Sequence, residues 1–257
     1  MNDRPDPLGG PARPPVARWR LVLAVTPAGG DDARQARQAA WEQALRSCGL
    51  PVAGLDADPP RPRYAVAAPL SPSIAGEAEL VDLWLTERLP RWRVREALEV
   101  AMPVDHRLVD VRDVWLGEPS LPGRVVGSVY RAELAADADA ALLTAASAAM
   151  RAAPTLRRER AKGAGTVSYD LRPFIVDLEV TAGPALRMTL RHDPERGIGR
   201  PDEVLAELAD RAGTPVVPRA IVRKALVLAD PKPPAPPPQR RTGPRPLASH
   251  DRPDARR

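Results

Sequence analysis

Apolar residues follow two different spacings along residues 19–116, and these spacings predict six secondary-structure elements. Short runs of apolar residues predict four strands, at 19–26, 64–69, 80–86 and 107–116. A helical repeat predicts one helix that begins at Asp31 and ends at Gly49, and a second helix that begins at Pro90. The predicted apolar stripe of the first helix consists of Ala33, Ala36, Ala40, Ala44 and Cys48. The order is therefore βαββαβ.

The same order returns after a turn-rich connector rich in Gly and Pro at 117–123. We predict strands or extended segments at 129–134, 166–180, 186–190 and 221–228, with Pro173 as a break. Asp137 is predicted to cap one helix, and Pro201 to begin the other. Two such units predict an α+β fold with tandem ferredoxin-like lobes, each an antiparallel sheet with helices on one face.

These patterns divide the chain into a first lobe at 18–117, a connector at 118–127 and a second lobe at 128–230. Segments 1–17 and 231–257 are rich in Pro and charge and have almost no apolar pattern, which is typical of disorder. Aromatic residues are only 4% of the chain, so each lobe has a thin aliphatic core. We therefore expect each lobe to need its neighbour to bury enough surface.

The net charge of +5 alone would suggest a nucleic-acid-binding protein, but the charge is not spread evenly along the chain. Segment 231–257 carries seven basic and two acidic residues, a net charge equal to that of the whole chain. A nearly neutral body argues against a nucleic-acid footprint over the whole domain. The tail is either a solvated segment or a basic arm for RNA or an acidic partner.

The residue types also bound the compartment and the chemistry. One cysteine, Cys48, allows no internal disulfide, and no apolar run approaches membrane-spanning length. We therefore expect a soluble, cytoplasmic protein without membrane contact. Only three histidines are present, widely spaced at His106, His192 and His250, and no phosphate loop or nucleophile elbow occurs. We expect no catalytic residues, no metal and no cofactor.

The strongest local feature is a basic run that leads into a Gly-rich turn, with Arg157, Arg158, Arg160 and Lys162 as candidate binding residues. Such a cluster could grip a phosphate backbone. The alternative is a solvated edge hairpin whose charges prevent aggregation. Trp84 and Tyr130 could stack bases on an exposed sheet face, but packing of one lobe's sheet on the other explains them more simply.

Several motifs occur in a characteristic order. They read GEAELVDL at 76–83, HRLVD at 106–110, VYRAEL at 129–134, YDLRP at 169–173 and GRPDEVL at 199–205. Together they resemble DUF2344, a radical-SAM-associated family of unknown function, over roughly residues 19–229. Members of that family occur fused to, or encoded beside, a radical-SAM protein with a cobalamin-binding-like domain, often near an RNA-processing ribonuclease. The resemblance implies a companion module.

The sequence departs from the family pattern in the first lobe. Relatives usually carry a Ser-His-Leu-Asp stretch at the first helix and a Gly-Phe-x-Pro-His-Pro-Lys stretch before the second strand. Here residues 29–33 read GGDDA and residues 58–64 read DPPRPRY. If those histidines form a site in relatives, this lobe has lost it.

The second lobe keeps more of the family's polar residues, so the resemblance adds Lys162, Asp170, Arg172 and Arg200 as candidate contacts. The two arginines could bind a carboxylate or phosphate bidentately, with Asp170 orienting one of them, or Asp170 could form a structural ion pair. We expect a non-catalytic companion of a radical-SAM protein encoded nearby, presenting an RNA or ribosome-associated substrate. The alternatives are a stand-alone RNA-binding protein that uses the 157–162 turn and the tail, and a divergent RNA-modifying enzyme.

Overall fold

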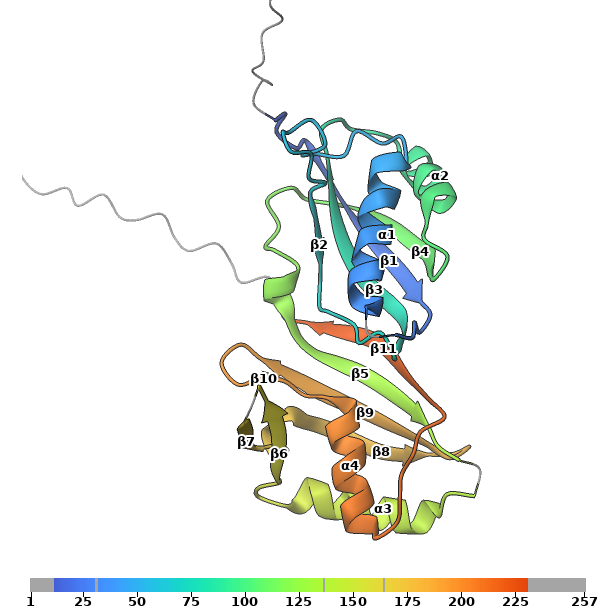
Figure 1. The fold of residues 1–257 in the computed structure, drawn as a ribbon, viewed down its shortest axis with the longest axis vertical. Coiled ribbons are helices and arrows are strands. Elements are labelled where there is room, and N and C mark those ends of the chain that lie inside the picture. Colours follow the sequence, from blue (N-terminus) through green and yellow to red (C-terminus); the bar gives the residue numbers. More distant parts are fainter. Residues whose placement is uncertain (1–11, 31, 136, 164, 231–257) are drawn as a thin grey trace, which may run out of the picture.

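A computed structural model describes residues 12–230 apart from 31, 136 and 164 (Figure 1). We predicted that residues 1–17 and 231–257 are disordered; of these, 1–11 and 231–257 lie outside the described residues, and Ala17 is the first residue of a strand. Residues 12–16 have no regular secondary structure, but the backbone N–H of Arg13 donates to Asp56 Oδ2 at 2.8 Å. No helix in the described part of the chain is both long and apolar enough to cross a membrane.

The first lobe has the predicted βαββαβ order. Its elements are β1 (Ala17–Val25), α1 (Ala33–Ser47), β2 (Tyr64–Val66), β3 (Ala75–Leu85), α2 (Arg91–Ala101) and β4 (His106–Val114). The strands lie in the order β2-β3-β1-β4, and all three pairings are antiparallel. Alternate residues of β1, among them Trp19, Leu21 and Leu23, pack against the helices because successive side chains of a strand point to opposite faces.

The second lobe repeats this order with one insertion. Its elements are β5 (Val125–Glu133), α3 (Ala140–Ala152), β8 (Ile175–Thr181), β9 (Ala185–Asp193), α4 (Pro201–Ala212) and β11 (Ala220–Leu228), with short pieces at η1 (Pro122–Arg124) and β10 (Gly197–Ile198). The inserted β6 (Arg157–Lys162) and β7 (Gly165–Asp170) form a separate two-stranded sheet. The segment 166–180, predicted as one extended stretch, is therefore two strands. They are separated by the turn η2 (Arg172–Phe174), which contains Pro173.

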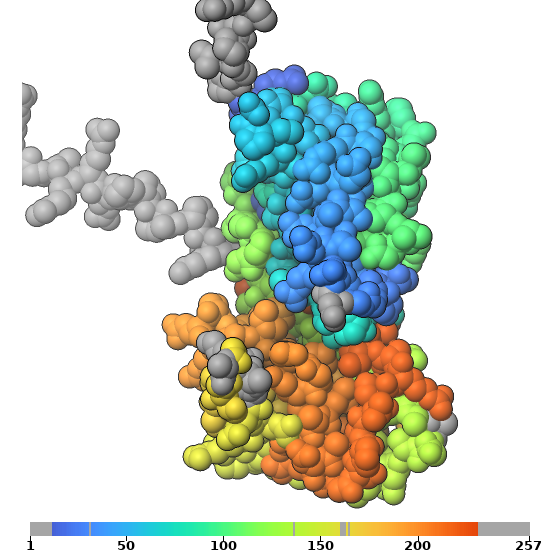
Figure 2. Space-filling view, viewed as in Figure 1, coloured from blue at the N-terminus to red at the C-terminus, as the bar shows by residue number. Residues whose placement is uncertain are grey.

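We had expected each lobe to have its own sheet, with the two sheets packed face to face. The two lobes instead share one sheet. Strand β11 pairs in parallel with β3 through Val222 with Ala75 and Arg223 with Gly76. This pairing joins all the strands except β6 and β7 into one nine-stranded, mostly antiparallel sheet. Strand β3 begins at residue 75 rather than at the predicted 80, and this additional segment makes the junction. The first lobe lies directly on the second in the space-filling view (Figure 2).

Two hydrophobic cores lie between the sheet and the helices, one in each lobe. Leu70, in the segment between β2 and β3, packs against both of them. The junction also places β11 beside β3, whose residues Glu79 and Val81 line a cavity under α1.

Candidate functional site: a pocket beneath helix α1

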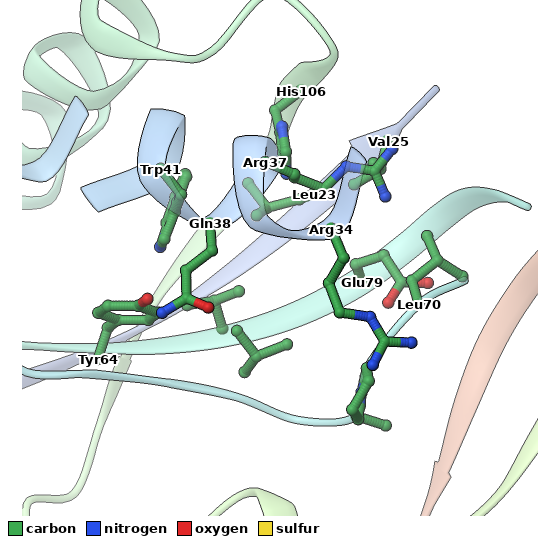
Figure 3. Close-up of a pocket in the computed structure, with 14 residues that line it drawn as sticks. Leu23, Val25, Arg34, Arg37, Gln38, Trp41, Tyr64, Leu70, Glu79 and His106 are labelled. Carbon is green, nitrogen blue, oxygen red and sulfur yellow. The ribbon is translucent and has the colours of Figure 1, made fainter. Parts of the chain in front are cut away.

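A cavity of about 390 Å³ lies between α1 and the strands β2 and β3, and it is called the α1 pocket below (Figure 3). Ligand pockets in proteins typically have volumes of roughly 300–1,000 Å³. Its aliphatic lining consists of Leu23, Val25, Val66, Ala68, Pro69, Leu70 and Val81. Its polar and aromatic lining consists of Arg34, Arg37, Gln38, Trp41, Tyr64, Glu79 and His106. Most of the surface is thus apolar, with a few polar groups at defined places.

Three rings form an aromatic wall at one end of the pocket. Trp41 stacks on His106 with ring centroids 5.7 Å apart and meets the edge of Tyr64 at 6.5 Å. Only 5% of Trp41 is exposed, and its Nε1 has no hydrogen-bond partner among the described residues. A buried N–H without a partner loses roughly 1–3 kcal/mol of hydration. The indole N–H is therefore a donor in need of an acceptor.

Asp105 holds His106 and Arg37 in place. Its Oδ1 lies 2.7 Å from His106 Nδ1, and its Oδ2 accepts from Arg37 Nε at 2.9 Å. Arg37 also donates to the carbonyl of Thr26 at 2.9 Å. Burial raises the pKa of Asp105, but the hydrogen bonds and charges of His106 and Arg37 outweigh it and lower that pKa. Asp105 is thus a carboxylate that fixes the ring of His106.

Glu79 is paired with a residue of the second lobe. Its two oxygens accept from Nε and Nη2 of Arg223, and both side chains are almost fully buried. The same guanidinium donates to the carbonyls of Ala68 and Pro69, each at 3.0 Å. Burial lowers the pKa of Arg223, but its bonds with Glu79 outweigh this effect and raise that pKa. The pair therefore ties β11 to one wall of the α1 pocket.

Arg34 is the pocket cation whose charge is not balanced nearby. It is exposed and makes no ion pair with any residue in the described ranges. In Figure 3 its side chain reaches along the pocket, away from the aromatic wall. Gln38 lies between Arg34 and Trp41 and donates to Glu42 at 3.1 Å. Burial, together with the negative charge of Glu42, raises the pKa of Tyr64, so the phenol stays protonated as a donor.

The predicted basic cluster lies on strand β6 of the inserted hairpin. Arg157 is exposed, whereas Arg158 forms ion pairs with Glu207 and Asp210 of α4. The side chains of Arg160 and Lys162 lie outside the described part of the chain. The charge of Arg158 is thus already neutralised within the protein, which leaves Arg157 as the described arginine of this cluster that faces solvent.

The other predicted residues are engaged within the second lobe. Asp170 Oδ1 accepts from the backbone N–H groups of Leu156 at 2.7 Å and Arg172 at 3.0 Å. The guanidinium of Arg172 donates to the carbonyls of Arg151 and Ile175, both at 2.9 Å. These contacts position the turn that leads into β8.

Arg200 does form the bidentate arrangement that we predicted, but with a carboxylate of its own chain. Its Nε and Nη2 donate to the two oxygens of Asp202, at 3.2 and 2.8 Å. The pair is about half exposed, so solvent screens it.

The two aromatic residues that we expected on sheet faces are not open to bases. Guanidinium groups of Arg18 and Arg63 lie 5.0 Å from the ring of Trp84. Tyr130 is buried in the core of the second lobe, with 5% of its surface exposed. Packing between two sheets, the alternative explanation, does not occur either, because the sheets meet edge to edge.

His192 forms a second polar contact, in the other lobe. Its Nε2 lies 3.0 Å from Ser128 Oγ. Burial, and then the charge of Arg223, lower the pKa of His192 to about 4. Ser128 is fully buried, so this Ser–His pair cannot reach a substrate. Within the described ranges, no three His, Cys, Asp or Glu side chains gather as metal ligands.

The sequence prediction missed the α1 pocket. The buried residues of α1 are Ala33, Trp41, Ala44 and Leu45, whereas Ala36 and Ala40 of the predicted stripe are exposed. The large ring of Trp41 turns a different face of the helix toward the sheet than the alanines suggested. The signal in the sequence that could have revealed this face of the helix is Trp41, an aromatic residue between Arg37 and Arg46.

Two βαββαβ repeats joined in one sheet, with a pocket beneath the first helix, define the structural class of this protein. The chain belongs to the family described as "Uncharacterized protein conserved in bacteria (DUF2344)", which matches residues 37–201. This match confirms the resemblance seen in the sequence. It covers the lining of the α1 pocket apart from Leu23, Val25 and Arg34. No curated protein matches this sequence.

Proposed function

We propose that this protein is a non-catalytic companion that holds a substrate for a radical-SAM enzyme. The observation that carries the proposal is the state of the groups in the α1 pocket. Of the groups suited to acid–base chemistry, Glu79 is buried in its ion pair with Arg223, and His106 lies within hydrogen-bond distance of Asp105 and stacks on Trp41. The remaining groups, the indole of Trp41 and the guanidinium of Arg34, are suited to binding.

The radical-SAM partner enters this proposal through the family resemblance described above. We further propose a cytoplasmic location and an RNA or ribosome-associated target for the pair. We propose that each lobe is ferredoxin-like, because its elements follow the chain order βαββαβ. Its four strands lie in the sheet in the order β2-β3-β1-β4 in the first lobe and β8-β9-β5-β11 in the second. Such lobes supply a rigid surface on which a substrate can be held.

The test is co-expression with the radical-SAM protein that this proposal places beside the gene. We expect the two proteins to elute together from affinity and size-exclusion columns. Separate elution at both low and high salt would count against the companion role. The α1 pocket can be tested without the partner, so a failed partnership and an empty pocket give different results.

Stand-alone RNA binding is a second candidate, favoured by the position of β6 and β7 in a sheet of their own. It predicts an RNA affinity that falls steeply with salt and that disappears when the hairpin and the tail lose their charges. Arg157→Gln should lower the slope of log affinity against log salt by about one, as expected for one lost phosphate contact. Arg158→Gln is the matched control, because Arg158 is paired with Glu207 and Asp210. No RNA binding at low salt would eliminate this candidate.

A further inference from the structure

We propose that the α1 pocket binds an elongated, flat organic acid. Its carboxylate pairs with Arg34, and a neutral acceptor at its other end takes the indole N–H of Trp41. This inference deepens the proposed function and rests on it, because it names the class of ligand that the companion holds.

Charge defines one end of the ligand. The pocket contains two ion pairs that are balanced, Arg37 with Asp105 and Glu79 with Arg223. Arg34 has no such partner among the described residues. One unbalanced guanidinium fits one carboxylate, which it can bind through two parallel hydrogen bonds. A cationic ligand would meet this charge without a free carboxylate to offset it.

The indole of Trp41 defines the other end. Its N–H has no partner among the described residues and is almost fully covered by its neighbours; it lies on the side of the ring near Gln38 and Tyr64 in Figure 3, so an acceptor reaches it when one of these two side chains moves aside. Seven residues separate Arg34 from Trp41 on the same helix, so the two groups share a face about 10 Å apart. The phenol of Tyr64 lies beside the indole, but its O–H already points to Glu42 Oε1 at 3.5 Å. Donors therefore occupy both ends of the pocket.

The surface between these ends defines the body of the ligand. It is aliphatic, with Leu23 and Leu70 among its residues, and the rings of Trp41 and Tyr64 close one end (Figure 3). A flat, two-ring aromatic acid buries its faces on such a surface and is long enough to reach both donors. A nucleotide fits this pocket less well, because its base edges need several hydrogen-bonding partners and its phosphate carries more charge.

The test uses 6-hydroxy-2-naphthoate as the probe, measured by titration calorimetry on the full-length protein. We expect it to bind. We expect 2-naphthol, which lacks the carboxylate, to bind at least roughly tenfold more weakly, the value of a charge-assisted hydrogen bond. We expect 2-naphthoate, which lacks the hydroxyl acceptor, to bind roughly three- to tenfold more weakly.

Two variants then assign each end to its residue. Arg34→Gln should weaken 6-hydroxy-2-naphthoate roughly tenfold and leave 2-naphthol unchanged. Trp41→Phe keeps a ring but removes the N–H, so it should weaken the binding of the hydroxy acid more than that of 2-naphthoate, which loses only part of the ring contact. Arg107→Gln, an exposed arginine of β4 outside the pocket, is the matched control and should change nothing.

Several results would overturn the inference. The first is that no naphthalene probe binds. The second is that 2-naphthol binds as tightly as 6-hydroxy-2-naphthoate. The third is that adenosine or uridine monophosphate binds more tightly than 6-hydroxy-2-naphthoate. The ligand series on the unaltered protein keeps the test valid if Trp41→Phe fails to fold. Binding of the acid without co-elution of the radical-SAM protein would refute only the partnership. Co-elution without binding would refute only the ligand class.

Discussion

The buried pair of Glu79 and Arg223 is expected to stabilise the junction between the two lobes. Only 6% of the Glu79 side chain and 2% of the Arg223 side chain are exposed. Removing one member leaves a buried charge without its partner, which typically costs about 3–5 kcal/mol. We expect Glu79→Met to lower the free energy of unfolding by an amount in this range. Arg223→Met should cost at least as much, because it also removes the donors to the carbonyls of Ala68 and Pro69.

The double variant separates the charge effect from the packing effect. With both charges absent, no buried charge remains unpaired, so the double variant should cost at least about 2 kcal/mol less than the sum of the single variants. The assay is urea unfolding, followed by circular dichroism and tryptophan fluorescence.

An exposed pair of the same chemistry provides the control. Arg187 and Glu179 lie 3.5 Å apart on neighbouring strands, and about half of each side chain is exposed. Arg187→Met should therefore cost less than about 1 kcal/mol. Single-variant losses at Glu79 and Arg223 below about 1 kcal/mol, or a double variant equal to the sum, would refute the reasoning.

Two further predictions concern the second lobe. Because the pKa of His192 is lowered to about 4 in the folded protein, the folded state favours the neutral ring. Its contribution to stability is therefore complete above pH 6.5 and is lost as the pH falls toward 4. The melting temperature of the His192→Gln variant should fall less between pH 7 and pH 5 than that of the unaltered protein. An equal fall would contradict the lowered pKa of His192. Asp139 caps α3 by accepting from Ala141 and Leu142, so Asp139→Ala should cost about 1 kcal/mol in urea unfolding. Asp137→Ala, at the cap that the sequence predicted, should cost less than about 0.5 kcal/mol, and a reversed order would contradict the structure.

The order of elements could be predicted because most helices and strands carry a regular apolar pattern. Strand β1 and helix α4 are examples, and both lie within two residues of their expected positions. The junction could not be predicted in this way. Its segment of β3 contains Gly76, Glu77 and Glu79, and the buried carboxylate of Glu79 becomes favourable only when Arg223 meets it. Local pattern contains no information about a partner 144 residues away.

The hairpin was predicted only as one of two readings of the basic run, and the α1 pocket escaped prediction. Strand β6 is almost entirely charged, so it has no apolar alternation to mark it as a strand. The pocket collects side chains from α1 and from β1, β2, β3 and β4, and its features come from what these side chains leave unpaired. The candidate residues Asp170 and Arg172 were polar in the sequence, but their capacity is used on the backbone of their own lobe.

The indole N–H of Trp41 offers the most direct measurement of ligand binding in the α1 pocket. In a ¹H–¹⁵N correlation spectrum, titration with 6-hydroxy-2-naphthoate should shift its resonance in the direction of a new hydrogen bond. Trp19 provides an internal control, because its Nε1 is also buried without a partner but does not line the pocket. We predict that the Trp41 resonance shifts and the Trp19 resonance stays in place. An unchanged Trp41 resonance at saturating ligand, or equal shifts of both indoles, would contradict the account.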